Sequence, residues 1–204
     1  MQDLTRTVQE AELWLSANDP LLGAIINNGP SLPCKVFNKE PFDALVQAVI
    51  SQQLSVKSAS AIQQRVHRLL PNGEPSADAF SRIPAEQLKK AGMSAAKVRT
   101  VENLIKFALA KNNRFDALHQ LPNQEVKRQL CELKGVGPWT ADIFLMFGLK
   151  RLDVFAAGDL GLRKAVQQLH KLKELPTADT CAIIAEKWQP YRTVAAWHLW
   201  QTID

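Results

Sequence analysis

The stretch that decides the fold is Leu130-Cys131-Glu132-Leu133-Lys134-Gly135-Val136-Gly137-Pro138-Trp139-Thr140-Ala141. A helical segment precedes the glycines and Pro138 can start a new helix, so the pattern predicts two helices joined by a tight hairpin. Gly135 and Gly137 allow backbone angles closed to other residues and let another backbone approach closely. Val136 can point inward and pin the hairpin. The amides at the start of the second helix then face outward, where they can hold a phosphate oxygen. A helix–helix turn without any ligand is the alternative for the same glycines.

Outward from the hairpin, the chain reads as almost wholly helical. Apolar residues recur at helical spacing over 42–54, and Ser55 can cap a following helix. The apolar positions of that second helix are spaced for one buried face: Val56, Ala59, Ile62, Val66 and Leu69. Few segments alternate as strands do, so we expect an all-α fold without significant sheet.

Composition bounds the class of protein. The chain has 204 residues and a formal net charge of +5, which modestly favours a nucleic-acid partner, although many basic proteins bind nothing acidic. Its 3 cysteines form no CxxC pair, which argues against a zinc site, an iron–sulfur cluster or a disulfide framework. We therefore expect no cofactor. The chain has no run of about 18 apolar residues and no signal-peptide pattern, so we expect no membrane association.

Three further segments accompany the hairpin: Pro41-Phe42 through Ser55, Asp153 through Asp159, and Trp188 through Trp200. Together the four motifs resemble the helix-hairpin-helix DNA glycosylase superfamily, and within it the 3-methyladenine DNA glycosylase II type. The resemblance covers roughly residues 19–204 and a compact form without an extra N-terminal β-domain. It implies an all-α, two-lobed helix-hairpin-helix glycosylase fold with a DNA-binding cleft between the lobes.

The expected organisation is one two-lobed glycosylase domain over residues 1–204. The lobe with the hairpin would span about 42–150, and the second lobe would combine about 1–41 with 151–204.

The function implied by the resemblance is that of a monofunctional DNA glycosylase, a hydrolase of N-glycosyl compounds. It would remove alkylated purines of the 3-methyladenine and 7-methylguanine type from duplex DNA and so initiate base excision repair. Asp159 is the catalytic candidate, because a carboxylate can stabilise the oxocarbenium ion that forms on the sugar. An Asp before a helix is also the usual N-cap, and the two roles are compatible. One carboxylate suffices because an alkylated, cationic purine leaves without a proton.

Two tryptophans are candidates for the base pocket, since an indole face attracts a cationic ring. Trp139 occupies the position where bifunctional relatives carry a lysine, and without an amine no Schiff base can form. Trp200 is the second candidate wall. Core packing is the alternative for each. His198 is expected to be structural rather than a general base.

The resemblance implies DNA contacts from the hairpin and from the end of the 42–54 helix. Gln53 aligns with the family residue that fills the gap left by a flipped base, and Leu54 is the close alternative. Gln53 could also be a plain polar helix terminus. The other predicted DNA contacts are Ser55, Lys134, Gly135, Val136, Gly137 and Thr140, the last through its hydroxyl. The main-chain carbonyls of Leu133 and Val136 resemble a family site for a monovalent cation.

Two alternative functions remain: a non-catalytic helix-hairpin-helix damage-recognition protein, and a glycosylase for other damaged bases. The intact Asp159 argues against the first. The missing hairpin lysine and the missing four-cysteine cluster argue against bifunctional oxidised-base enzymes. The expected partner is double-stranded DNA with alkylated bases, bound by a monomer. The expected location is intracellular: cytoplasm or nucleoid in a bacterium, nucleus in a eukaryote.

Overall fold

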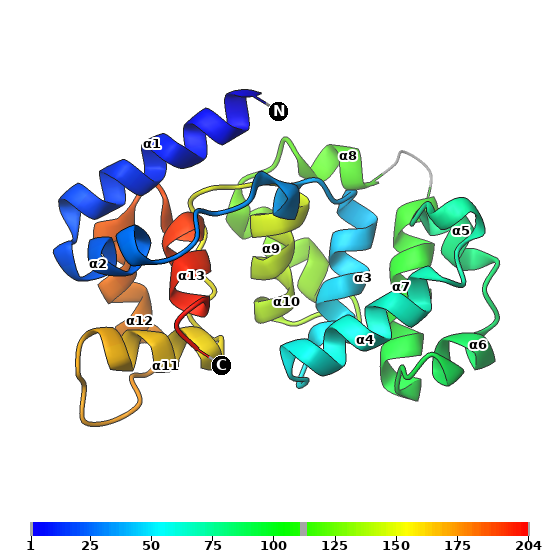
Figure 1. The fold of residues 1–204 in the computed structure, drawn as a ribbon. Helices are drawn as coiled ribbons and strands as arrows, with labels where there is room; N and C mark the ends of the chain where they lie inside the picture. Colours follow the sequence, from blue (N-terminus) through cyan, green and yellow to red (C-terminus); the bar gives the residue numbers. More distant parts are fainter. Residues whose placement is uncertain (1, 111–113, 204) are drawn as a thin grey trace. The chain divides into compact units, whose positions relative to one another are not determined.

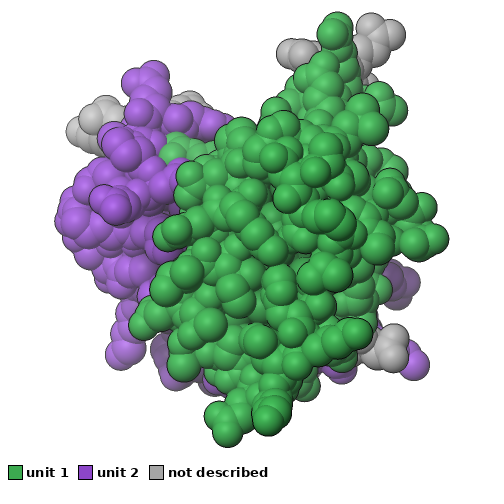
Figure 2. Space-filling view, turned by 90° about the vertical axis from the view of Figure 1, so that its left-hand side faces the viewer, with its two compact units in different colours: residues 1–38, 150–204 green, residues 39–149 purple. Residues whose placement is uncertain are grey.

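The computed structural model describes residues 2–110 and 114–203, and within these ranges every regular element is a helix (Figure 1). This confirms the all-α prediction. The chain separates into two compact units, coloured in Figure 2. Unit 1 comprises Met1–Asn38 and Lys150–Asp204, and unit 2 comprises Lys39–Leu149.

Unit 1 joins segments that lie far apart in the sequence. Its first segment contains α1 (Gln2–Asn18), α2 (Pro20–Asn28) and the 3-10 helix η1 (Cys34–Phe37). Its second contains α11 (Leu160–Leu169), α12 (Ala178–Ala185), the 3-10 helix η4 (Glu186–Trp188) and α13 (Arg192–Trp200). α13 packs against α1, α2 and α11.

The two segments of unit 1 meet at a buried carboxylate. Asp19 is 4% exposed and caps α2 by accepting hydrogen bonds from the amides of Leu21 and Leu22. It also accepts the indole N–H of Trp188 at 2.8 Å and pairs with Lys187 at 2.8 Å. Burial raises the pKa of Asp19, but the hydrogen bonds from Lys187 and Trp188 outweigh burial and hold the pKa below its usual range.

Unit 2 is a continuous run of helices around α3 (Pro41–Ser51). α3 packs against four helices: α4 (Val56–His67), α7 (Ala95–Leu109), α10 (Pro138–Ile143) and the π-helical turn η3 (Phe144–Gly148). The remaining elements are η2 (Pro71–Gly73), α5 (Ala77–Ser81), α6 (Ala85–Lys90), α8 (Arg114–Leu118) and α9 (Asn123–Cys131). Serines start three of these helices. The predicted cap Ser55, and likewise Ser76 and Ser94, each accept a backbone N–H of the first turn.

Two expectations about this unit are wrong. The helix predicted over 42–54 ends at Ser51, because Gln53 has a φ of 54°, in the left-handed region that ends a helix. Val56, predicted on the buried face of the next helix, is 87% exposed, whereas Ala59 and Val66 on that face are buried. Val56 is the first residue of α4, where the helix has not yet reached the packed part of the unit.

No helix in 2–110 and 114–203 has the length and hydropathy that crossing a membrane requires.

Candidate functional site

The hairpin lies between the end of α9 at Cys131 and the start of α10 at Pro138. Val136 is 5% exposed, and its amide donates to the carbonyl of Leu133 at 2.9 Å, so it points inward as expected. Gly135 has a φ of 97°, and a Cβ at this position would overlap the hydroxyl of Thr100 on α7. The fold therefore requires glycine at position 135.

Gly137 differs from Gly135. Its φ of −107° suits any residue, and a Cβ built on it meets no heavy atom within 4 Å. Packing in this unit does not demand a glycine at position 137. Its small size instead leaves open space at the N-terminus of α10, where an approaching ligand backbone could lie.

The other hairpin residues are placed as follows. Lys134 is exposed, and its carbonyl accepts a hydrogen bond from Asn103 on α7. The carbonyl of Leu133 accepts one hydrogen bond and, like any carbonyl oxygen, has a second lone pair. The carbonyls of Leu133 and Val136 both belong to the turn between α9 and α10.

The predicted contact between the Thr140 hydroxyl and DNA is wrong. The residue is 1% exposed, and its hydroxyl accepts a hydrogen bond from the side-chain amide of Gln52 at 2.8 Å. A hydroxyl buried in this way is not at the surface to meet a phosphate. The sequence placed it in the first turn of α10 but could not show which way it faces.

The turn after α3 carries the predicted gap-filling residues. Gln53 is exposed and Leu54 is 38% exposed, so both side chains stand at the surface of unit 2. Gln53 holds its left-handed φ of 54° without being a glycine, and such strain is typical of functional turns. Ser55 is exposed and its hydroxyl accepts the amide of Ser58, which confirms the predicted cap of α4.

Sequence reasoning did not identify two residues that hold this turn, Gln52 and Lys97. The Nε2 of Gln52 donates to the carbonyl of Gly135 at 3.0 Å as well as to Thr140. Lys97, in the first turn of α7, donates its Nζ to the carbonyls of Ile50 and Gln52, each at 2.8 Å. Burial lowers the pKa of Lys97. A lysine at the C-terminal end of a helix neutralises unpaired carbonyls there, but only the folded chain shows which helix it reaches.

Asp159 stands at the N-cap of α11, half-buried. Its Oδ1 accepts the amide of Leu162 at 2.8 Å and the indole N–H of Trp200 at 2.9 Å. A side chain at Gly161 would come within 3.0 Å of this oxygen. Of the two predicted pocket tryptophans, Trp200 thus contacts the catalytic candidate directly. Trp139 is half-buried as the second residue of α10, in the other unit.

The loop that leads to Asp159 is held by α13. Arg192 forms hydrogen bonds with both carboxylate oxygens of Asp153, at 2.7 and 3.0 Å. The hydroxyl of buried Thr193 contacts the main chain of Arg151 and Val154. Together with the Trp200 contact, one face of a nine-residue helix fixes both the loop and the carboxylate. These contacts give Arg192, Thr193 and Trp200, three residues of the segment Trp188 through Trp200, a role in holding the loop and Asp159.

His198 lies deep in unit 1, 1% exposed, with Nε2 3.0 Å from Glu12. Burial lowers its pKa, and the Glu12 carboxylate only partly opposes this. A buried, neutral imidazole fits the expected structural role.

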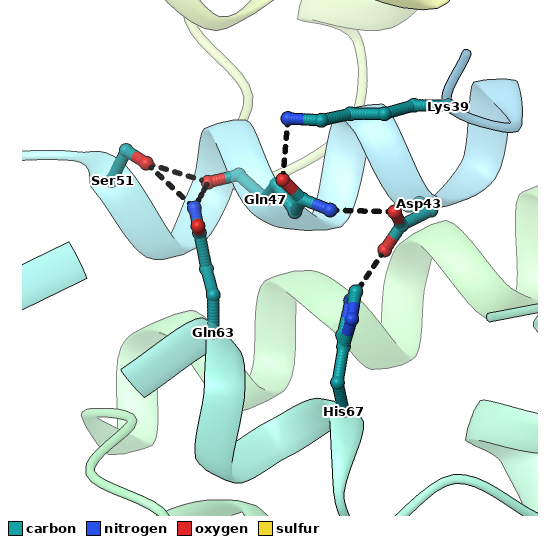
Figure 3. A network of polar contacts seen from close by, with 6 residues as sticks. All are labelled: Lys39, Asp43, Gln47, Ser51, Gln63 and His67. Carbon is teal, nitrogen blue, oxygen red and sulfur yellow. Dashed lines mark hydrogen bonds and ion pairs between the residues drawn. The ribbon is translucent and has the colours of Figure 1, made fainter. Parts of the chain in front are cut away.

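A second polar network in unit 2 connects α3 to α4 (Figure 3). Lys39 donates to Gln47, whose amide donates to buried Asp43, and Asp43 also pairs with His67 at 2.9 Å. The amide of Gln63 donates to the carbonyl of Gln47 at 3.3 Å and to the hydroxyl of Ser51 at 3.1 Å. None of these contacts involves the hairpin, so the network serves the packing of α3 on α4.

The chain belongs to the HhH-GPD superfamily of base excision DNA repair proteins, whose profile matches residues 46–190. More narrowly, it is similar to DNA-3-methyladenine glycosylase 1 of Schizosaccharomyces pombe, with 31% identity over 207 aligned residues that cover 98% of this chain and 90% of that protein.

Solved structures agree. The structure of the S. pombe 3-methyladenine DNA glycosylase Mag1 in complex with abasic DNA superposes with a TM-score of 0.86 and 32% identity, covering 95% of this chain and 96% of that one. A DNA-3-methyladenine glycosidase from Bacillus halodurans superposes with a TM-score of 0.73 and 33% identity, covering 94% and 88%. The resemblance inferred from the four motifs is confirmed.

Proposed function

We propose that this protein is a monofunctional DNA glycosylase that hydrolyses the N-glycosidic bond of alkylated purines in duplex DNA, as the first step of base excision repair. Both units act together as one glycosylase domain. The protein works as a monomer in the compartment that holds the DNA, the nucleoid of a bacterium or the nucleus of a eukaryote.

The observation that carries the proposal is the fixed carboxylate of Asp159. Two N–H groups, from Leu162 and Trp200, hold its Oδ1 at 2.8 and 2.9 Å. Such donors, together with the N-terminus of α11, stabilise the negative charge and fix its direction before the substrate arrives. Preorganised charge of this kind is a large source of transition-state stabilisation.

The proposed reaction needs no proton donor. The N-glycosidic bond breaks with its electron pair going to the cationic purine, which leaves as a neutral base. The deoxyribose becomes an oxocarbenium ion that the Asp159 carboxylate stabilises. A water molecule adds to the sugar carbon and releases its proton to solvent. Because Trp139 has no amine, the route through a Schiff base and strand cleavage is closed.

The DNA is held mainly by its phosphates. The N-terminus of α10 at Gly137, with Lys134 beside it, binds a phosphate oxygen, and Gln53 or Leu54 fills the gap left by the flipped base. A cation on the carbonyls of Leu133 and Val136 would add positive charge near the same phosphate.

The test is chromatography of the bases released from methylated duplex DNA. Wild-type protein should release 3-methyladenine and 7-methylguanine, and Asp159→Asn should release them about 10²–10³ times more slowly. An intact, DNA-binding wild-type protein that releases neither base would instead support the non-catalytic damage-recognition alternative.

A further inference from the structure

Gln52 joins two elements that the proposed function assigns to DNA, namely the turn at Gln53 and the hairpin at Gly135. We propose that Gln52 is a positioning residue for base flipping. It holds the gap-filling residue and the phosphate-binding loop at a fixed separation. This inference rests on the proposed function and adds a residue to its machinery.

The side chain of Gln52 makes the connection to the hairpin. A side-chain amide has two N–H donors, and the Nε2 of Gln52 reaches two acceptors, the carbonyl of Gly135 at 3.0 Å and the hydroxyl of Thr140 at 2.8 Å. Gly135 lies in the loop of the hairpin, and Thr140 lies in the first turn of α10. We call these two hydrogen bonds the Gln52 bridge.

The partners of the bridge are themselves fixed. Gly135 is in the left-handed region with its α-carbon against Thr100, and Thr140 is 1% exposed. Neither acceptor can turn away without disturbing packed residues. The bridge therefore fixes the position of Gln52 relative to the hairpin.

The main chain of Gln52 is held from another direction. Lys97 donates to its carbonyl and to that of Ile50, which anchors the end of α3 to α7. The next residue is Gln53, with its strained φ of 54°. Because Gln53 follows directly, any displacement of Gln52 moves the side chain that is proposed to enter the DNA.

This arrangement matters because flipping needs two points of contact. The hairpin fixes one phosphate, and the gap-filling residue must then meet the base stack at a set distance from that phosphate. A misplacement of about 1 Å in such a constellation can cost about 10²-fold in rate. Binding to undamaged duplex needs only the phosphate contacts and should not depend on this separation.

The experiment replaces Gln52 by an apolar residue of similar length. Gln52→Met should slow single-turnover base release from alkylated duplex by about 10- to 100-fold. It should also reduce the fluorescence increase of a 2-aminopurine placed beside the lesion, which reports unstacking. The loss should appear in kcat, while KM and the Kd for undamaged duplex stay within about 3-fold of wild type.

Gln63→Met is the matched control. Gln63 also donates one amide to a main-chain carbonyl and a hydroxyl in unit 2, those of Gln47 and Ser51 (Figure 3). Its substitution removes the same kinds of hydrogen bond without touching the hairpin. At a temperature where both variants are folded, Gln63→Met should keep wild-type base release and the wild-type fluorescence change.

A second variant covers the case in which Gln52→Met does not fold. Thr140→Val keeps the shape of the side chain but removes one acceptor of the bridge, and should give a smaller loss of the same kind. Where both variants fold, the double variant should lose less than the product of the single losses, because both changes remove one shared hydrogen bond.

Three results would overturn the bridge: equal base release by Gln52→Met and Gln63→Met, losses in the double variant that simply multiply, or a loss of undamaged-DNA affinity as large as the loss of base release. A wild-type protein that releases no alkylated base would instead overturn the proposed function.

Discussion

The two glycines of the hairpin should respond in opposite ways to the same small change. Gly135→Ala should chiefly lower the free energy of unfolding, because its added methyl group overlaps the packed residue Thr100. Gly137→Ala should leave stability unchanged and weaken DNA binding. Each variant serves as the control for the other, because the two added methyl groups lie within one turn.

The magnitudes follow from the backbone angles and the space around each α-carbon. At Gly135, a φ of 97° costs an alanine about 1–2 kcal/mol, and the overlap with Thr100 adds about 1–3 kcal/mol. The total, about 2–5 kcal/mol, is a large part of the roughly 5–15 kcal/mol by which a domain is stable. At Gly137, the φ of −107° and the open space predict a change within about 0.5 kcal/mol.

Loss of binding in Gly137→Ala is expected because the methyl group would occupy the space that a phosphate needs. A hydrogen bond to a charged group contributes about 1.5–3 kcal/mol, so the Kd should rise by at least about 10-fold. Losing a phosphate contact should also reduce the salt dependence of binding. Urea denaturation and fluorescence anisotropy on undamaged duplex measure the two effects. Wild-type affinity and salt slope in Gly137→Ala would refute the hairpin's role in binding DNA.

Four further outcomes are expected. Asp159→Asn should change the free energy of unfolding by about 1 kcal/mol or less, because asparagine also caps helices. Its loss in the rate of base release should be smaller for 7-methylguanine, which leaves more easily, and near-normal release would show that Asp159 is only a helix cap. Gln53→Gly should raise the free energy of unfolding by up to about 1 kcal/mol, because glycine adopts a φ of 54° without strain. The same variant should slow base release, and release at the wild-type rate would exclude Gln53 as the gap-filling residue. Borohydride should trap no covalent enzyme–DNA adduct, since Trp139 cannot form a Schiff base, and a trapped adduct would reveal lyase activity. Burial lowers the pKa of His198, so the neutral imidazole favours the folded state above pH 6.5, and the free energy of unfolding should fall as the pH drops from 7.5 to 5.5. In urea titrations, His198→Gln should weaken this pH dependence of stability. The same pH dependence in His198→Gln and wild type would contradict a lowered pKa for His198.

What could be read from the sequence was local. The hairpin, the Ser55 cap and Asp159 at the start of α11 depend on residues within a few positions of one another, so residue types predict the local geometry. The resemblance of the four motifs then supplied the fold. At Gln53 the apolar pattern predicted too long a helix, because such a pattern carries no information on the backbone angle φ.

The contacts that organise the site are long-range and were therefore missed. The amide of Gln52 reaches acceptors 83 and 88 residues away. A glutamine has no sequence signal that tells a hairpin bridge from a solvated side chain. No sequence signal showed that the hydroxyl of Thr140 is buried, and it was expected at the surface. Nor did any signal show that Arg192 and Thr193 of α13 hold the loop before Asp159.

The discontinuity of unit 1 sets an order of assembly. Unit 2 is one uninterrupted stretch of chain, so all the residues that make its contacts are present once Lys39–Leu149 has been synthesised. Unit 1 cannot close until α13 reaches α1 and α2, helices made more than a hundred residues earlier. The unit proposed to bind DNA can thus form first, and the Asp159 carboxylate acquires its Trp200 partner only when α13, the last helix of the described residues, is in place. A chain that ends before α13 is therefore expected to lose the proposed base release before it loses the proposed DNA binding.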